Sequence, residues 1–514
     1  MKRLLAASLI LGFTLAVSTG AAASPENDTF IYGIGGDPGN DINTISTSGR
    51  YDLTAERLLY SPLFNYYGPE DIEYRLAESF ELSEDGLELT VHLREGVVWS
   101  DGEPFTADDV VFTYDKIINT DYANGHDSFV FGDEKVSVEK IDDYTVKFTT
   151  PMYSAAILEN IGAEHYIMAK HIYEGDETLD NNPKNATPVG TGPYILEEYA
   201  AGQYMKFKAN ENYFLGAPKI GTLILQFVQD QTTALLSLQK GEINALVIDN
   251  VSDAQDLDTN AVTVYAYPED RVGYFMFNLS SSRTGDINLR KAVFYALNRT
   301  ELNMGTYQSE DYYVDAVSLL PYSNPYVTDE VEDYAYDPDK AAEYLAQVEG
   351  DIPTLRLAYT ANNLTQETQA LIAQQELKAA GIDVELKAMD GNALVDLWYE
   401  ENDDYDITIG GYIMGIDPGS YSSLFVSDGS ANFYHLSDEE LDGYFAAGSV
   451  ETDPDVRFED YKKAQQRLAD LAVQYPIVTN LRILAVTNDV EGIDEARLIP
   501  IYTLSNYDLL SFKK

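Results

Sequence analysis

The residue types that most often catalyse reactions or bind metals are present, but not at the spacing that such chemistry needs. Residues 256–260 resemble the start of a calcium loop, yet Ala261 replaces the required glycine and Tyr267 the terminal glutamate. There is no GxSxG motif and no cysteine. The histidines form neither an HExxH motif nor an i, i+4 pair; they are His92, His126, His165, His171 and His435. We therefore expect no metal site and no cofactor.

One stretch combines an apolar strand, a glycine-rich turn and a single carboxylate. It runs from Tyr405 to Gly419, with an aromatic ring at Tyr412 and an acid at Asp417. A carboxylate held out of water makes stronger hydrogen bonds with a charged partner than a neutral group does. The alternative is that Asp417 only caps the turn before Pro418. Both interpretations stay open, and this is the stretch that we expect to border a ligand.

The elements that would position such a site follow from periodicity. Apolar residues alternate with polar ones over 87–93, which is typical of a strand with one buried face. Residues 100–102 break the chain, and Thr106 then has the form of a helix N-cap whose hydroxyl accepts the backbone N–H of Asp109. Residues 136–150 predict a hairpin around Asp142. Helices and strands alternate in the last third of the chain, which favours a parallel α/β sheet there.

The segment from Ala77 to Tyr114 contains an ordered series of short motifs. They are Ala77–Ser79, Asp85–Leu87, His92–Val97, Trp99–Gly102, Pro104–Val110 and Phe112. Two later motifs are Thr187–Tyr194 and the strand–helix pair of residues 274–278 and 288–299. In this series the chain resembles the family 5 extracytoplasmic solute-binding proteins of ABC transporters, of the oligopeptide- and dipeptide-binding type. So long an ordered match is specific for the family and not for the ligand.

The resemblance implies an α/β protein of the periplasmic-binding-protein type II. Two lobes would enclose a ligand cleft, and the first lobe would carry an extra inserted subdomain. The expected division is a signal peptide at 1–23; lobe I at 24–66, 187–282 and 485–514; the inserted subdomain at 67–186; and lobe II at 283–484.

The resemblance also assigns a role to the glycine-rich turn. In peptide-binding members this turn carries an aromatic residue and an aspartate, and the aspartate pairs with the free amino group of the peptide. Here Tyr412 stands where Trp is usual, and the aspartate expected near Met414 or Gly415 is missing. Residues 414–418 instead resemble a Leu-Gly-Ile-Asp-Pro form of another branch, in which Asp417 would serve the amino group.

Three further residues are placed at the cleft by the same resemblance. Tyr122 corresponds to a loop position that reaches the ligand. Tyr274 is a candidate for lining the cleft, although an aromatic residue on a strand more often belongs to a core. Asp37 lies in the turn after the strand Thr29–Ile34, and the equivalent turn borders the cleft in the family.

The chain is strongly acidic, with 33 Lys and Arg against 86 Asp and Glu and a net charge of −53. Such a surface argues against partners that are nucleic acid or anionic lipid. Attraction of a cationic ligand is one explanation of the acidity. A solvated acidic surface is the other, and it is favoured because the acids are spread along all 514 residues. We expect a monomer whose partners are a small solute and a membrane permease.

The N-terminus has the features of a cleavable signal peptide. Lys2 and Arg3 precede an apolar run, Leu4–Val17, that is too short to span a bilayer, and Ala21–Ala23 offer a cleavage site. A membrane anchor is the alternative. Because no cysteine is present for a lipid anchor, we expect a protein that is free in the periplasm or the extracellular medium.

The function implied is that of the substrate-binding component of an ABC importer, which captures oligopeptides and delivers them to a permease. Main-chain hydrogen bonds to an extended peptide would tolerate different side chains. Within the binding class, the alternatives are an oligosaccharide and a nickel or other metal chelate. A secreted hydrolase is the alternative from another class, since paired carboxylates are hidden among so many acids. We expect a binding protein and not an enzyme.

Overall fold

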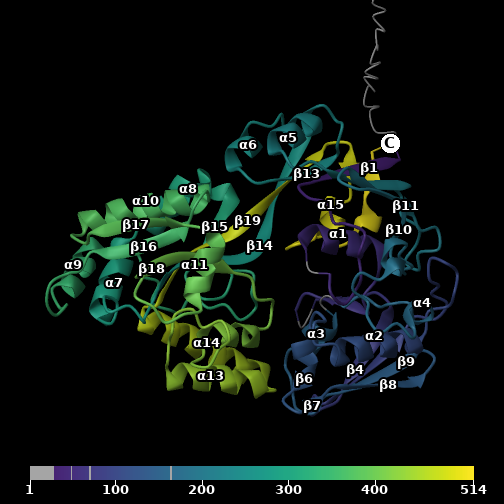
Figure 1. The fold of residues 1–514 in the computed structure, drawn as a ribbon, viewed down its shortest axis with the longest axis horizontal. Coiled ribbons are helices and arrows are strands. Elements are labelled where there is room, and N and C mark those ends of the chain that lie inside the picture. Colours follow the sequence, from purple (N-terminus) through teal and green to yellow (C-terminus); the bar gives the residue numbers. More distant parts are fainter. Residues whose placement is uncertain (1–27, 48, 69–70, 163–164, 514) are drawn as a thin grey trace, which may run out of the picture.

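The computed structural model describes residues 28–47, 49–68, 71–162 and 165–513. The predicted signal peptide, 1–23, lies outside these residues. Two lobes lie side by side and are joined by two long strands, β14 (Val262–Phe277) and β19 (Gln474–Thr487) (Figure 1). These strands pair antiparallel with each other. The predicted two-lobed α/β fold is confirmed.

Lobe I comprises the described residues up to Pro268 and those from Leu481 onward. Its part of the main sheet has the strand order β10-β11-β12-β1-β13, after which β19 follows. The strands are β1 (Thr29–Ile34), β10 (Tyr194–Ala200), β11 (Tyr204–Ala209), β12 (Thr222–Phe227) and β13 (Ala245–Ile248). The helices are α1 (Arg50–Leu59), α5 (Gln231–Gln239), α6 (Val251–Gln255) and α15 (Ile493–Ala496). Two short strand pairs complete the C-terminal segment: β20 (Val490–Glu491) with β23 (Ser511–Phe512), and β21 (Leu498–Ile499) with β22 (Thr503–Leu504).

The inserted subdomain has a sheet and a core of its own. Its sheet order is β4-β5-β9-β8, formed by β4 (Ala77–Leu82), β5 (Glu88–Leu93), β8 (Ser137–Asp142) and β9 (Thr145–Thr149). The helices are α2 (Ala107–Asn119), α3 (Ile157–Gly162) and α4 (Lys170–Tyr173). Two further pairs are β2 (Phe64–Tyr66) with β3 (Ile72–Tyr74), and β6 (Val130–Phe131) with β7 (Glu134–Lys135).

Local sequence explains these elements well. Leu89, Val91 and Leu93 are buried on one face of β5, as the alternation predicted. The N-cap of α2 is Thr106, whose hydroxyl accepts the N–H of Asp108 at 3.3 Å, while the Asp109 carboxylate accepts the N–H of Thr106 at 3.0 Å. The hairpin predicted over 136–150 is formed by β8 and β9.

Lobe II, Val272–Thr479, contains the parallel strands that were expected, within a sheet that is mixed as a whole. β16 runs parallel to both β17 and β18, but β18 pairs antiparallel with β14. The strands are β15 (Tyr313–Asp315), β16 (Leu355–Thr360), β17 (Val384–Met389) and β18 (Ile407–Tyr412). The helices are α7 (Ile287–Ala296), α8 (Arg299–Tyr307), α9 (Pro338–Leu345), α10 (Leu364–Ala379), α11 (Gly391–Trp398), α12 (Ser422–Phe425), α13 (Glu439–Val450) and α14 (Pro454–Leu471).

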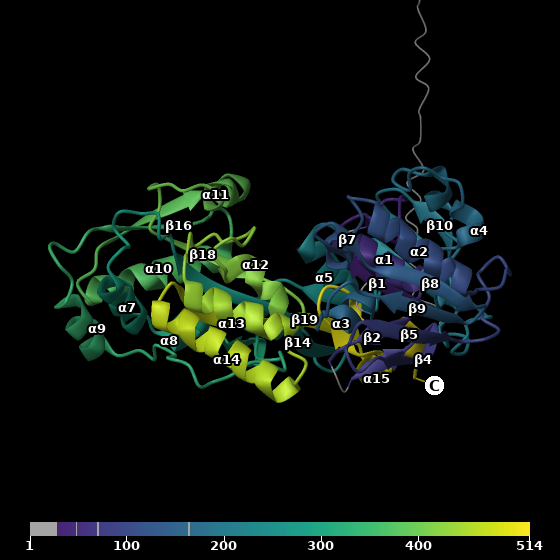
Figure 2. The same cartoon turned by 90° about the horizontal axis from the view of Figure 1, so that it is seen from below.

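Both views place the connection between the lobes at β14 and β19 (Figures 1 and 2). The chain crosses from one lobe to the other within these two strands. The domain boundaries expected at 282 and 484 stay a prediction. Among the described residues, no helix combines the length and apolar character needed to cross a membrane.

Candidate functional site at the junction of the lobes

In the main sheet, the carboxyl ends of a lobe I strand and a lobe II strand both lie at the junction of the lobes. Ile248, at the carboxyl end of β13, pairs with Ile483 on β19. Tyr412, at the carboxyl end of β18, pairs with Val272 on β14. These ends therefore face each other across the segment where the chain passes between lobes. Open α/β sheets bind ligands outside the carboxyl ends of their parallel strands, so this junction is the candidate site.

At this junction β14 carries a bulge of three charged residues. Pro268 pairs with Leu481 and Val272 with Thr479, so residues 269–271 lie opposite Asn480 alone. Glu269 forms ion pairs with Arg50 of α1, at 3.3 Å, and with Arg482 of β19, at 3.1 Å. These two contacts fix the lobe I side of the bulge.

Asp270, in the middle of the bulge, has a φ of 55°, which is uncommon for a residue other than glycine. Its carboxylate accepts the hydroxyl of Ser323, which belongs to lobe II, at 2.5 Å. Burial raises the pKa of Asp270 above its ordinary value. The bulge is thus held from both lobes.

The turn after β18 holds Asp417 in a buried ion pair. One carboxylate oxygen accepts the N–H of Gly419 at 2.7 Å, and the other is 2.6 Å from the Arg457 guanidinium of α14. The two side chains are 8 % and 7 % exposed. The turn-capping contact considered from the sequence is present, at the start of a 3-10 turn, Pro418–Tyr421.

Arg457 has further partners in lobe II. It donates to the carbonyl of Gly448 at 2.8 Å and to the hydroxyl of Tyr326 at 2.7 Å, and it lies 5.1 Å from the ring centre of Tyr461. Burial disfavours the charged guanidinium, but the Asp417 carboxylate outweighs this effect and raises the pKa of Arg457. The Arg457 guanidinium therefore stays charged.

The inserted subdomain contacts this same turn from the opposite lobe. Glu159 of α3 accepts the backbone N–H of Ile416 through one oxygen and that of Asp417 through the other, each at 2.7 Å. Gly415 has a φ of 83°, and a Cβ there would lie 2.7 Å from the Glu159 carboxylate. A glycine at 415 therefore permits both the turn and the close approach of the carboxylate.

The predicted Tyr274 and Tyr412 do come together, but in the core of lobe II. They are 2 % and 8 % exposed, and their ring centres are 5.2 Å apart. The Tyr412 hydroxyl donates to the carbonyl of Leu319 at 2.6 Å and accepts from the Gln474 amide at 3.0 Å. Both rings thus lie in the core, which is the alternative that the sequence left open for Tyr274.

The other two predicted residues, Asp37 and Tyr122, lie on the surface of lobe I. Asp37 accepts the N–H groups of Gly39 and Gly202, each at 2.7 Å, and the hydroxyl of Tyr199. It thereby ties the turn after β1 to the β10–β11 hairpin. Tyr122 is 48 % exposed, and its hydroxyl lies 3.4 Å from that of Thr178. The structure does not bring these two residues into contact with Asp417.

Sequence reasoning missed Glu159, Arg457 and the charged bulge. The bulge had a sequence signal, because three consecutive charged residues, 269–271, interrupt an otherwise apolar and aromatic strand. Glu159 and Arg457 carry no local signal, since their partners lie 258 and 40 residues away. Only the fold brings them to the turn.

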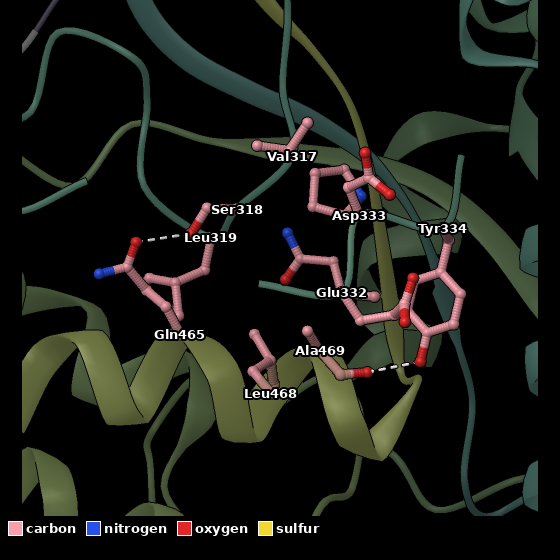
Figure 3. Close-up of a pocket in the computed structure, with 11 residues that line it drawn as sticks. Val317, Ser318, Leu319, Glu332, Asp333, Tyr334, Gln465, Leu468 and Ala469 are labelled. Atoms are coloured by element: carbon pink, nitrogen blue, oxygen red, sulfur yellow. Dashed lines mark hydrogen bonds between the residues drawn. The ribbon is translucent and has the colours of Figure 1, made fainter. Parts of the chain in front are cut away.

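Two small cavities within the described residues are too small to hold a solute. Figure 3 shows one beside α14, with a volume of about 10 Å³, where Ser318 donates to Gln465 and Tyr334 to the carbonyl of Ala469. A second, lined by Arg57, Arg75 and Asn506 among others, has about 20 Å³. Each has room for about one water molecule. Within the described ranges, no group of three or more His, Cys, Asp or Glu side chains is arranged to hold a metal ion.

Comparisons with known proteins agree with this architecture. A sequence model of the bacterial extracellular solute-binding proteins, family 5, matches residues 71–433. The dipeptide-binding protein of Escherichia coli is 31 % identical over 66 % of this chain and 66 % of its own. Heme-binding protein A of Haemophilus influenzae is 26 % identical over 92 % of this chain and 90 % of its own.

A solved structure extends the likeness to the whole fold. The ABC transporter substrate-binding protein CtaP of Listeria monocytogenes superimposes with a TM-score of 0.89 at 36 % identity, covering 95 % of this chain and all of its own. The two lobes joined by β14 and β19 therefore define a substrate-binding protein of the type II periplasmic-binding class. The chain belongs to the bacterial extracellular solute-binding proteins, family 5.

Proposed function

We propose that the protein captures oligopeptides outside the cytoplasm and delivers them to the permease of an ABC importer. The observation that carries this proposal is the convergence of strand ends from both lobes on the 269–271 bulge, together with the Glu159 contact that joins the lobes there. Peptide binding is supported by the relative named as a dipeptide-binding protein. A solute held between lobes favours their closed arrangement because it contacts both.

The proposal gives the predicted residues different tasks. The turn Tyr412–Asp417 borders the solute, while the Tyr274 and Tyr412 rings support it from the core. A carboxylate offers about four acceptor positions, so Asp417 has capacity for a peptide amino group beside Arg457 and Gly419. Asp37 and Tyr122 are the candidates for contacts from the lobe I side.

The proposal includes export through the N-terminal signal peptide, a monomeric state, and the absence of catalysis and of nucleic-acid binding. Heme is the second candidate solute, favoured by the relative named for heme binding that spans nearly the whole chain. Either solute would be bound and released unchanged.

The decisive experiment is mass spectrometry of compounds released by denaturing the purified protein, followed by thermal-shift titration with each compound found. We expect peptides, and a melting temperature that rises with their concentration. Release of heme or a sugar in place of peptides would contradict the peptide assignment. Chemical conversion of an added peptide by the purified protein would contradict the assignment as a binding protein.

A further inference from the structure

Arg271, the last residue of the charged bulge, has a free guanidinium. Within the part of the chain that the structure describes, it is the arginine that makes no hydrogen bond and no ion pair. Its bulge neighbours are engaged, Glu269 with Arg50 and Arg482, and Asp270 with Ser323. The lack of a partner is therefore specific to this position and not a property of the bulge.

A glycine on the adjacent strand, Gly411, makes room for this guanidinium. Gly273 of β14 pairs directly with Gly411 of β18. A Cβ on Gly411 would lie 2.1 Å from the central carbon of the Arg271 guanidinium. One on Gly273 would make only an ordinary contact of 3.6 Å with Nη1 of Arg271, and its close neighbour would be a methyl group of Val478 at 2.9 Å. Any side chain at 411 would displace the guanidinium from the strand end.

The surroundings of Arg271 are aromatic and partly buried. Tyr274 and Tyr307 lie close enough that the positive charge acts on both phenols, although burial dominates and raises the pKa of each to about 12. Arg271 itself is half-buried. A guanidinium has five N–H donors, and donors that lose water without gaining an acceptor cost free energy.

Acceptors are abundant in this chain, which carries 86 acidic residues against 33 basic ones. The other arginines of the junction each have a protein partner, as Arg50 and Arg457 show. An unpaired guanidinium at the carboxyl ends of the strands therefore indicates an acceptor that comes from outside the chain. A planar carboxylate matches the fork of N–H donors and accepts two hydrogen bonds at once.

We infer that Arg271 receives a carboxylate of the bound solute, and that Gly411 leaves the space in which the guanidinium lies. The inference rests on the proposed solute-binding function and adds a chemical class to it: the solute is an acid. For a peptide, the acceptor is its terminal or side-chain carboxylate. The protein would then discriminate against the same solute with that group amidated or absent.

Two matched pairs of probes test the inference. The first is a mixture of tri-, tetra- and penta-alanine and the same mixture as C-terminal amides. The second is galacturonate and galactose, which covers the sugar alternative. Binding is measured by equilibrium dialysis and by the shift in melting temperature. The wild-type protein should bind at least one of the two pairs. Within that pair, we expect it to bind the carboxylate compound about 10- to 100-fold more tightly than the amide or the neutral sugar.

The variants are Arg271→Gln, Arg271→Lys and, as a control, Arg283→Gln, which removes a lobe II guanidinium that is 37 % exposed and 3.4 Å from Asp406. Arg271→Gln should abolish the preference for the acid. Arg271→Lys should keep part of it, because the charge remains while the fork is lost. Arg283→Gln should keep all of it.

The outcomes separate the two proposals. If neither alanine mixture binds, the peptide proposal fails, and the sugar pair then decides on Arg271. If the wild-type protein binds no acid more tightly than its neutral partner, the inference is overturned without recourse to any variant. It is equally overturned if a folded Arg271→Gln protein retains the wild-type preference.

Discussion

Glu159 accepts the backbone N–H of Asp417 at 2.7 Å, although the two residues are 258 positions apart and belong to different lobes. The second carboxylate oxygen makes an equally short bond to Ile416. One side chain of the inserted subdomain thus holds both of its acceptor atoms against the turn that follows β18. This contact is expected to favour the closed arrangement of the lobes.

Replacing Glu159 with Gln should weaken that contact. The amide keeps one acceptor oxygen but directs an N–H₂ group at a backbone N–H, so one hydrogen bond to a charged acceptor is lost, worth about 1.5–3 kcal/mol. We expect a larger radius of gyration in small-angle X-ray scattering without solute. The dissociation constant of a peptide found to co-purify should rise about tenfold or more.

The matched control for Glu159 is Glu174→Gln. The Glu174 side chain is 69 % exposed, and its carboxylate lies 4.0 Å from the ammonium group of Lys170. It should change neither the scattering nor the affinity. Identical scattering curves and affinities for Glu159→Gln and the wild-type protein would show that the contact does not influence closure.

Replacing Asp417 with Asn should lower stability whether or not a solute is present. The substitution leaves the buried Arg457 without its counter-charge, which typically costs about 3–5 kcal/mol. Chemical denaturation measures this loss. The double variant Asp417→Asn, Arg457→Met should regain much of it, because no uncompensated charge is then buried.

The same Asp417→Asn protein tests the amino-group role. At a temperature where the variant is folded, it should lose more affinity for a peptide with a free amino terminus than for the acetylated form. Equal loss for the two peptides would confine Asp417 to the support of Arg457 and the turn.

Replacing Tyr412 with Ala should destabilise the empty protein strongly. The ring is packed against Tyr274 and Tyr421, with centres 5.2 and 5.6 Å away, and removing a buried aromatic side chain costs about 3–5 kcal/mol. Differential scanning calorimetry measures the change. Tyr412→Phe should lose less, since only the hydroxyl bonds disappear. A melting temperature for Tyr412→Ala close to that of the wild-type protein would instead place the ring at the solute surface.

We expect the stability of the protein to depend on pH because of Glu376 on α10. Burial raises its pKa from 4.5 to about 7, although the N–H of Asn298 donates to it at 3.0 Å. The folded state therefore holds a proton that the unfolded chain releases, and the free energy of unfolding falls as the pH rises from about 4.5 to about 7. Above pH 7 the loss is complete.

Glu376→Gln isolates this effect, because the amide oxygen still accepts from Asn298 while the charge is gone. The variant should melt at a higher temperature than the wild-type protein at pH 8 and at a similar temperature at pH 4. A constant difference between the two proteins at both pH values would exclude titration of Glu376 as the cause.

Much of the fold was predictable because its determinants are local. The alternation over 87–93 marks β5, and the Thr106–Asp109 cap marks the start of α2. The parallel strands expected in lobe II are β16, β17 and β18, but β14 and β19 extend the same sheet with antiparallel strands that were not foreseen. Their pairing joins positions about 200 residues apart, which periodicity does not show.

The candidate site was less predictable for a related reason. The Tyr412–Asp417 turn was found because an aromatic residue, a glycine and an acid lie within six residues of each other there. The guanidinium that pairs with Asp417 and the carboxylate that contacts its N–H come from α14 and α3. Neither has a spacing that points to the turn. Arg271 was visible as a charge within a strand, but its lack of a partner is a property of three-dimensional packing.

The two strands that connect the lobes also determine how the lobes can move. Because β14 and β19 are hydrogen-bonded to each other on both sides of residues 269–271, sliding one lobe along the strands would break the register of the whole ribbon. Twisting about a single strand is resisted by its neighbour. Bending perpendicular to the sheet remains, and it concentrates at the three residues that lack ladder bonds. The two strands thus form a hinge at residues 269–271, and we expect the lobes to close by bending in one direction, perpendicular to the sheet.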